Sequence, residues 1–132
     1  MTLFQALQAL APACSSVIVD HGTWLTVEQT PYTPEQLATD PRALDHVHGA
    51  LQRRCQALGW FVRSITRRKG VLCRVSPGQT FSEPKALQAR GENHAHALAL
   101  SLVRVVRVFP PQDARTADPE VDALAYATWG HL

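Results

Sequence analysis

The sequence lacks any apolar run long enough to cross a membrane. A membrane-spanning helix needs about 20 consecutive apolar residues, and the longest apolar stretch of this chain is interrupted by Arg104 and Arg107. The opening segment Met1-Thr2-Leu3-Phe4 also lacks the basic region of a secretory signal peptide. We therefore expect a protein with no membrane partner that resides in the cytoplasm.

Cysteine is scarce as well. The 132 residues include 3 cysteines, Cys14, Cys55 and Cys73, which are far apart and form no C-x-x-C pair. An odd number of separated cysteines in a cytosolic chain is typical of small buried hydrophobic residues. We predict neither a disulfide framework nor a catalytic thiol.

The signatures of several enzyme classes are missing. The chain has no glycine-rich phosphate loop, no G-x-S-x-G, no H-E-x-x-H and no zinc-finger spacing. The pairs His46-x-His48 and His94-x-His96 fall in predicted helices, where residues i and i+2 point about 200° apart, so one ion cannot bind both. We predict no metal, no cofactor and no enzymatic activity, and we expect His94 and His96 to be neutral structural residues.

An uneven distribution of charge lies beneath a formal net charge of +2. Residues 53–107 carry eleven basic side chains against two acidic ones, a net of +9, whereas the rest of the chain carries a net of −7. Two interpretations follow. The acidic flanks neutralise the centre, within one chain or across a dimer, or the centre forms an anion-binding face.

Hydrophobic periodicity and turn residues predict an α+β protein with the order α-β-β-α-β-β-(β)-α-α. The predicted elements are a helix over 3–11, a hairpin over 17–27, a capped helix start at Thr33, a helix between Asp40 and Gly59, a hairpin over 60–75, an edge strand around 79–88, and a helix over 94–109 capped by Asn93. Because the strands come in hairpins, we expect an antiparallel sheet with helices packed on it. We assign residues 1–110 to a single domain, 111–118 to a linker and 119–132 to a tail helix.

The second hairpin carries the candidate binding site. With Lys69-Gly70 as a two-residue turn, residue 68 pairs with 71, 67 with 72, 66 with 73, 65 with 74 and 64 with 75. One face then presents Val62, Ser64, Thr66, Val71, Cys73 and Val75, and the other presents Phe61, Arg63, Ile65, Arg67, Leu72 and Arg74. The candidate anion-binding or nucleic-acid-binding residues are Arg63, Arg67, Arg68, Lys69 and Arg74.

This mixed face has two interpretations. Interleaved cationic and apolar side chains suit phosphate contact and base stacking. They also suit a sheet covered by a helix, from under which the arginine stems reach water. We expect the covered sheet, because Phe61, Ile65 and Leu72 are many apolar residues for a face in solvent.

Short motifs between residues 32 and 106 carry a resemblance to a known family. Pro31-Tyr32-Thr33 precedes an amphipathic helix, Gly59-Trp60 leads into a hairpin, and the segment 89–93, Ala-Arg-Gly-Glu-Asn, precedes a helix rich in alanine and leucine. In these features the chain resembles the phage ABA sandwich domain, a family of small phage and prophage proteins. The resemblance implies a non-enzymatic protein and brings no catalytic residues.

The order α-β-β-(β)-α also resembles a double-stranded-RNA-binding domain. Such domains carry lysines at the start of the last helix, where this chain has Glu92 and no lysine. We therefore expect first a small binding or regulatory protein of phage type that acts through a protein partner or as a homo-oligomer. Val121, Leu124 and Trp129 of the tail helix are its candidate contacts, and a nucleic-acid-binding or nucleotide-binding module is the alternative.

Overall fold

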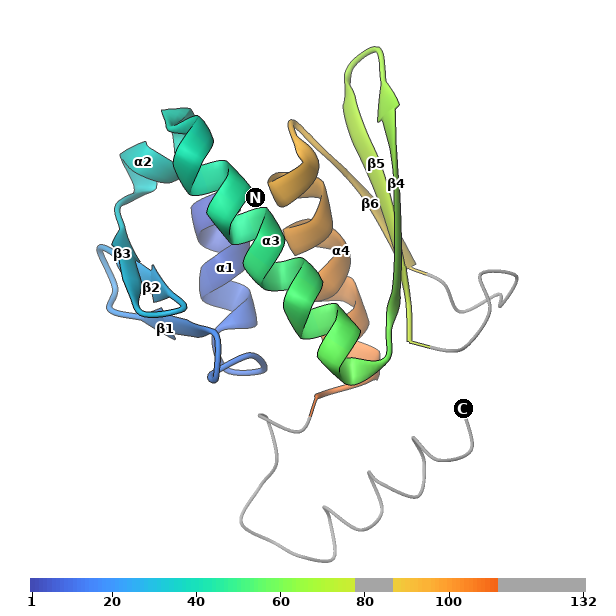
Figure 1. Cartoon of the computed structure of the whole chain (residues 1–132), viewed down its shortest axis with the longest axis horizontal. Coiled ribbons are helices and arrows are strands. Elements are labelled where there is room, and N and C mark those ends of the chain that lie inside the picture. The colour runs from blue at the N-terminus through green and yellow to red at the C-terminus, as the bar shows by residue number, and fades with distance from the viewer. Residues whose placement is uncertain (78–86, 112–132) are drawn as a thin grey trace, which may run out of the picture.

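Two small antiparallel sheets lie on either side of a layer of helices in the computed structural model (Figure 1). The structure describes residues 1–77 and 87–111, so the predicted tail helix with Val121, Leu124 and Trp129, and nearly all of the predicted linker, lie outside the described residues. The α+β class and the antiparallel hairpins are confirmed. The two hairpins belong to separate sheets, of order β1-β2-β3 and β4-β5-β6, rather than to one.

The described elements follow each other in this order: α1 (Leu3–Leu10), β1 (Ile18–Asp20), β2 (Leu25–Val27), β3 (Thr30–Tyr32), α2 (Pro34–Thr39), α3 (Pro41–Leu58), β4 (Phe61–Arg67), β5 (Gly70–Ser76), β6 (Leu87–Gly91) and α4 (His94–Val108). No helix within the described ranges is long and apolar enough to cross a membrane.

Helix ends are set by capping side chains at the predicted positions. Thr33 forms a capping box with Gln36 at the start of α2, and Asp40 and Asn93 accept backbone N–H groups at the starts of α3 and α4. These side chains satisfy N–H groups that have no partner inside the helix. Gly59 ends α3 with φ +73°, a left-handed conformation that favours glycine.

The smaller sheet contains a strand that the sequence did not predict. β3 pairs with β2 through a tight turn at Glu28 and Gln29, which both have positive φ. Such turns are usually signalled by Asn-Gly or Asp-Gly, so this one carried no sequence signal. Pro31 is tolerated in β3 because β3 is an edge strand.

The larger sheet corrects the predicted register. β4 and β5 pair from Phe61 with Ser76 to Arg67 with Gly70, two residues away from the predicted pairing, and the turn lies at Arg68-Lys69 rather than at Lys69-Gly70. Gly70 belongs to β5, where it has φ +124° and lies against Gly91 of β6. A shift of two residues keeps every side chain on its predicted face.

The third strand of this sheet also lies elsewhere than predicted. β6 covers Leu87–Gly91, whereas the sequence placed an edge strand around 79–88. Every residue of β6 therefore pairs with a residue of β5. The prediction failed because it treated these residues only as a lead into the following helix.

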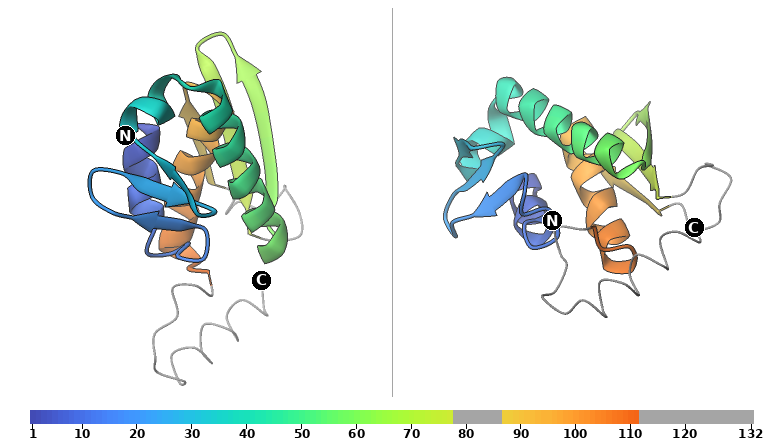
Figure 2. Two further views of the ribbon diagram at one scale, coloured as in Figure 1. Left: turned by 60° about the vertical axis from the view of Figure 1, so that its left-hand side comes forward. Right: turned by 60° about the horizontal axis from the view of Figure 1, so that its bottom comes forward.

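Helix α4 forms the centre of the core. It packs on α1 and α3 on one side and on β5 and β6 on the other (Figure 2), and Ser101 in α4 donates a buried hydrogen bond of 2.7 Å to the Cys73 carbonyl. All three cysteines are buried and none forms a disulfide, as predicted. Burial raises the pKa of the Cys55 thiol to about 12 and that of Cys73 to about 11, so both remain protonated.

Candidate functional site

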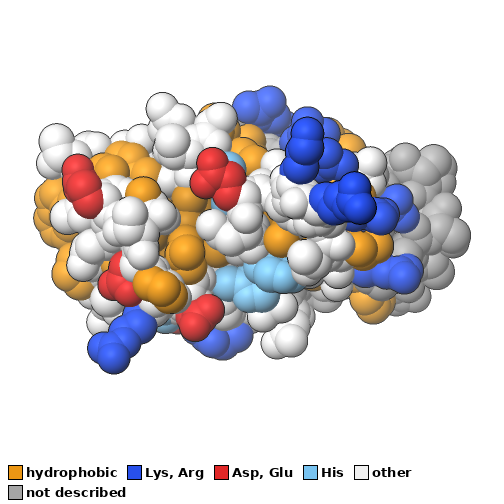
Figure 3. Space-filling view, turned by 90° about the horizontal axis from the view of Figure 1, so that it is seen from above, with side chains coloured by type: hydrophobic (Ala, Val, Ile, Leu, Met, Phe, Trp, Pro, Cys, Tyr) orange, Lys and Arg blue, Asp and Glu red, His pale blue; other side chains and the backbone are white. Residues whose placement is uncertain are grey.

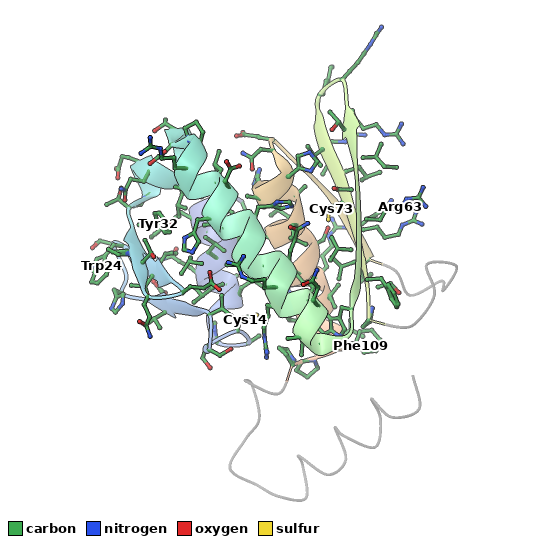
Figure 4. The ribbon with its side chains drawn as sticks, in the orientation of Figure 1. Cys14, Trp24, Tyr32, Arg63, Cys73 and Phe109 are labelled. Atoms are coloured by element: carbon green, nitrogen blue, oxygen red, sulfur yellow. The ribbon has the colours of Figure 1, made fainter. Side chains whose placement is uncertain are left out.

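The outer face of the larger sheet carries most of the candidate residues. Cys73 points from β5 toward α4, whereas Arg63 points from β4 in the opposite direction, away from the helices (Figure 4). We call this outer surface the basic face. Its residues are Phe61, Arg63, Ile65 and Arg67 from β4, Leu72 and Arg74 from β5, and Gln88 and Arg90 from β6.

The expected helical cover is absent from the described part of the chain. All the described helices lie on the other side of this sheet (Figure 2), and two of the three apolar residues of the basic face are solvent-accessible, Phe61 at 37% and Ile65 at 41%. The prediction of a covered face is therefore wrong for these residues. The core needs no second layer here, because α4 already buries the inner face of the sheet, including Val71, Cys73 and Val75.

The observed register brings arginines together on the basic face. Arg63 lies directly opposite Arg74, where the predicted register had placed Ile65. Arg90 of β6 lies opposite Leu72 and extends the cationic surface to the third strand. Sequence reasoning missed Arg90 because it did not place β6 correctly, although Arg90 alternates with the buried residues Ala89 and Gly91.

Few side chains offset these cations. The ion pairs found in residues 1–77 and 87–111 all involve Glu28, which lies in the other sheet's turn. Arg74 donates a hydrogen bond of 3.3 Å to the Gln88 side chain, a neutral partner. Arginines directly opposite each other repel, and the described ion pairs do not offset this repulsion on the basic face.

Arg68 and Lys69 lie apart from the sheet surface. They occupy the turn between β4 and β5 and are exposed. Figure 3 shows the lysine and arginine side chains gathered mainly toward one end of the molecule and the aspartate and glutamate side chains toward the other. On the face seen in Figure 3, the uneven charge of the sequence is thus largely a separation in space as well.

A second polar cluster fixes the smaller sheet to α3. The Tyr32 hydroxyl hydrogen-bonds to Nδ1 of His46, and Nε2 of His46 lies 3.0 Å from Oε1 of Glu28. Arg53 donates to the same carboxylate at 2.6 Å. The Arg53 guanidinium, helped by His46, lowers the pKa of Glu28. This cluster holds the β2–β3 turn, in which Glu28 has positive φ, against α3.

The predicted structural role of His96 is confirmed by its contacts. Its Nδ1 accepts a hydrogen bond of 3.0 Å from the Glu92 N–H, and its Nε2 donates to the Met1 carbonyl at 2.8 Å. This pattern requires a neutral ring. His94 instead contacts Ser64 and His48. Among the described residues, no group of three or more His, Cys, Asp or Glu side chains could hold a metal ion.

Comparison with known proteins adds no relative. No protein-family model, no curated protein and no solved structure matches this chain.

Proposed function

We propose that this chain is a non-enzymatic binding protein that contacts single-stranded nucleic acid through the basic face. The proposal rests on one observation. Arginines without a described acidic partner alternate with the accessible side chains of Phe61 and Ile65 on a sheet face that none of the described helices covers. The resemblance to the phage ABA sandwich domain, which brings no catalytic residues, supports the non-enzymatic part and implies a phage or prophage origin.

The mixture of side chains favours a single strand over a duplex. Arginine binds phosphate, and aromatic and aliphatic surfaces bind the faces of unstacked bases. A duplex presents its phosphates but keeps its bases stacked inside, so Phe61 and Ile65 would find no apolar partner. Single strands satisfy both kinds of group at once.

The opposed pair Arg63 and Arg74 supports the same function. The pair repels in the free protein, and a bound phosphate would remove the repulsion by interacting with both guanidinium groups. Relief of the repulsion between Arg63 and Arg74 would therefore add to the free energy of binding.

Protein contact is a competing function with its own observation. The acidic side chains visible in Figure 3 lie mainly toward the end of the molecule opposite to the arginines, so the acidic end of one copy would complement the basic face of another. Size-exclusion chromatography with light scattering at low and high salt tests this. Salt-sensitive oligomers would support contact between copies, and a monomer at both salt concentrations would count against it.

Fluorescence anisotropy with a labelled single-stranded oligonucleotide tests the nucleic-acid proposal. Single-strand binding weakens by about 0.7 logarithmic units per phosphate contact for each tenfold rise in salt. If Arg63, Arg67, Arg74 and Arg90 each contact a phosphate, the expected slope is roughly −3. A duplex of equal length should bind more weakly than the single strand.

The decisive variant is the double substitution Arg63→Gln/Arg74→Gln. It should reduce the affinity at least about tenfold and lower the salt slope by about 1.4. The control is Arg42→Gln/Arg107→Gln, which removes the same charge from exposed helical positions outside the sheet. Equal losses in both variants, or no loss in either, would contradict a role for the basic face.

A further inference from the structure

Two imidazole rings from different helices converge on one side of the helical layer. His48 lies within α3 and His94 is the first residue of α4, and their ring centroids are 5.7 Å apart with an interplanar angle of 54°. Histidine side chains lie together at the surface in Figure 3. Sequence reasoning considered only histidine pairs within one helix and did not predict this pair between two helices.

Ser64 orients one of these rings. Its hydroxyl lies 3.2 Å from Nδ1 of His94. When Nδ1 carries the proton, its N–H donates a hydrogen bond to the Ser64 oxygen, and Nε2 presents a free lone pair. Histidines that bind metals typically have this arrangement, in which a hydrogen bond at one nitrogen fixes the tautomer and directs the other nitrogen at the ion.

The separation of the rings fits a shared ion. A zinc–nitrogen distance of 2.0–2.1 Å places each ring centroid about 3.2 Å from the metal, so two rings at a tetrahedral angle have centroids about 5.2 Å apart. The observed 5.7 Å requires only a small movement of the exposed His94 ring. Because no third protein ligand joins them among the described residues, water would complete the coordination.

We propose that His48 and His94 together bind one divalent transition-metal ion of the kind that prefers imidazole, namely Zn²⁺, Ni²⁺ or Cu²⁺. The site is exposed and retains positions for water or an external ligand. Because two side chains and water would hold the ion, we expect it to be exchangeable rather than structural. It is also independent of the nucleic-acid proposal, because it does not use the basic face.

Isothermal titration of the full-length protein with Zn²⁺ alone tests the site. We expect one ion per chain, and we expect His48→Gln and His94→Gln each to weaken binding about tenfold or more. Ser64→Ala should weaken it less than either histidine substitution, because Ser64 orients a ligand without being one. The control is His21→Gln, which removes an exposed histidine stacked on Trp24 in the smaller sheet's first hairpin.

The outcomes are distinguishable. Circular dichroism of each variant establishes that it is folded, and the three cysteines are buried and therefore do not compete for the metal in the folded chain. Loss of binding in His48→Gln and His94→Gln but not in His21→Gln supports the site. No binding by the unaltered protein, or equal binding by all the histidine variants, would overturn it.

Discussion

Gly70 lies so close to Gly91 across the larger sheet that β5 has no room for a side chain at this position. A Cβ atom on Gly70 would overlap with the carbonyl oxygen of Gly91, and a Cβ atom on Gly91 would overlap with the backbone of Ala97 in α4. The contact joins the start of β5, the end of β6 and the first turn of α4. It therefore fixes the register of the sheet that carries the basic face.

Replacement of Gly70 by alanine should consequently destabilise the fold. The substitution combines a residue at φ +124° with a backbone overlap, and we expect a loss of about 2 kcal/mol or more in the free energy of unfolding. Gly22→Ala is the control, since Gly22 also has positive φ but no atom within 4 Å of an added Cβ. It should cost about 1 kcal/mol. Urea unfolding of both variants measures the difference, and equal losses would show that the close approach is unimportant.

Sequence periodicity predicted the two faces of the second hairpin correctly even though the register was wrong. Side chains alternate with a period of two, so a register shift of two residues leaves Arg63 and Arg74 on one face and Cys73 on the other. Which residues stand opposite each other depends on the turn. The position of the turn depends on how Gly70 fits against Gly91, and local sequence patterns do not reveal this contact.

Features set by long-range packing were also missed. β3 forms through a turn at Glu28 and Gln29. Hydrogen bonds from His46 and Arg53, which belong to the distant helix α3, hold Glu28 in place. The pair His48 and His94 depends on how α3 crosses α4. None of the described helices covers the basic face, because they pack on the other side of the sheet, and alternation of side chains alone does not decide which side this is.

Acidification should destabilise the protein through His48. Its pKa in the folded chain is lowered from 6.5 by burial and by His94, so the unfolded chain binds more protons as the pH falls below 6.5, and stability decreases. The contribution is complete above pH 6.5 and is lost toward the lower, folded-state pKa. Melting temperatures between about pH 5 and 7.5 should fall less in His48→Gln than in the unaltered chain. Measurement above about pH 5 avoids the titration of Glu28, whose lowered pKa acts at more acidic values. An identical pH dependence in both proteins would show that His48 makes no contribution.

The last prediction separates stability from binding on the basic face. Arg63→Glu places a carboxylate directly opposite Arg74 and replaces a repulsive pair with an attractive one, so we expect stability to be unchanged or raised by about 0.2–1 kcal/mol. The same substitution should weaken binding of single-stranded nucleic acid, because it removes a phosphate contact and adds a negative charge. A double-mutant cycle with Arg74→Gln, read by urea unfolding and by anisotropy, isolates the pairwise term. A variant that is both more stable and less able to bind would indicate that Arg63 is retained for its ligand. A variant that loses stability and retains its affinity would show that the arginines of this sheet support the fold instead.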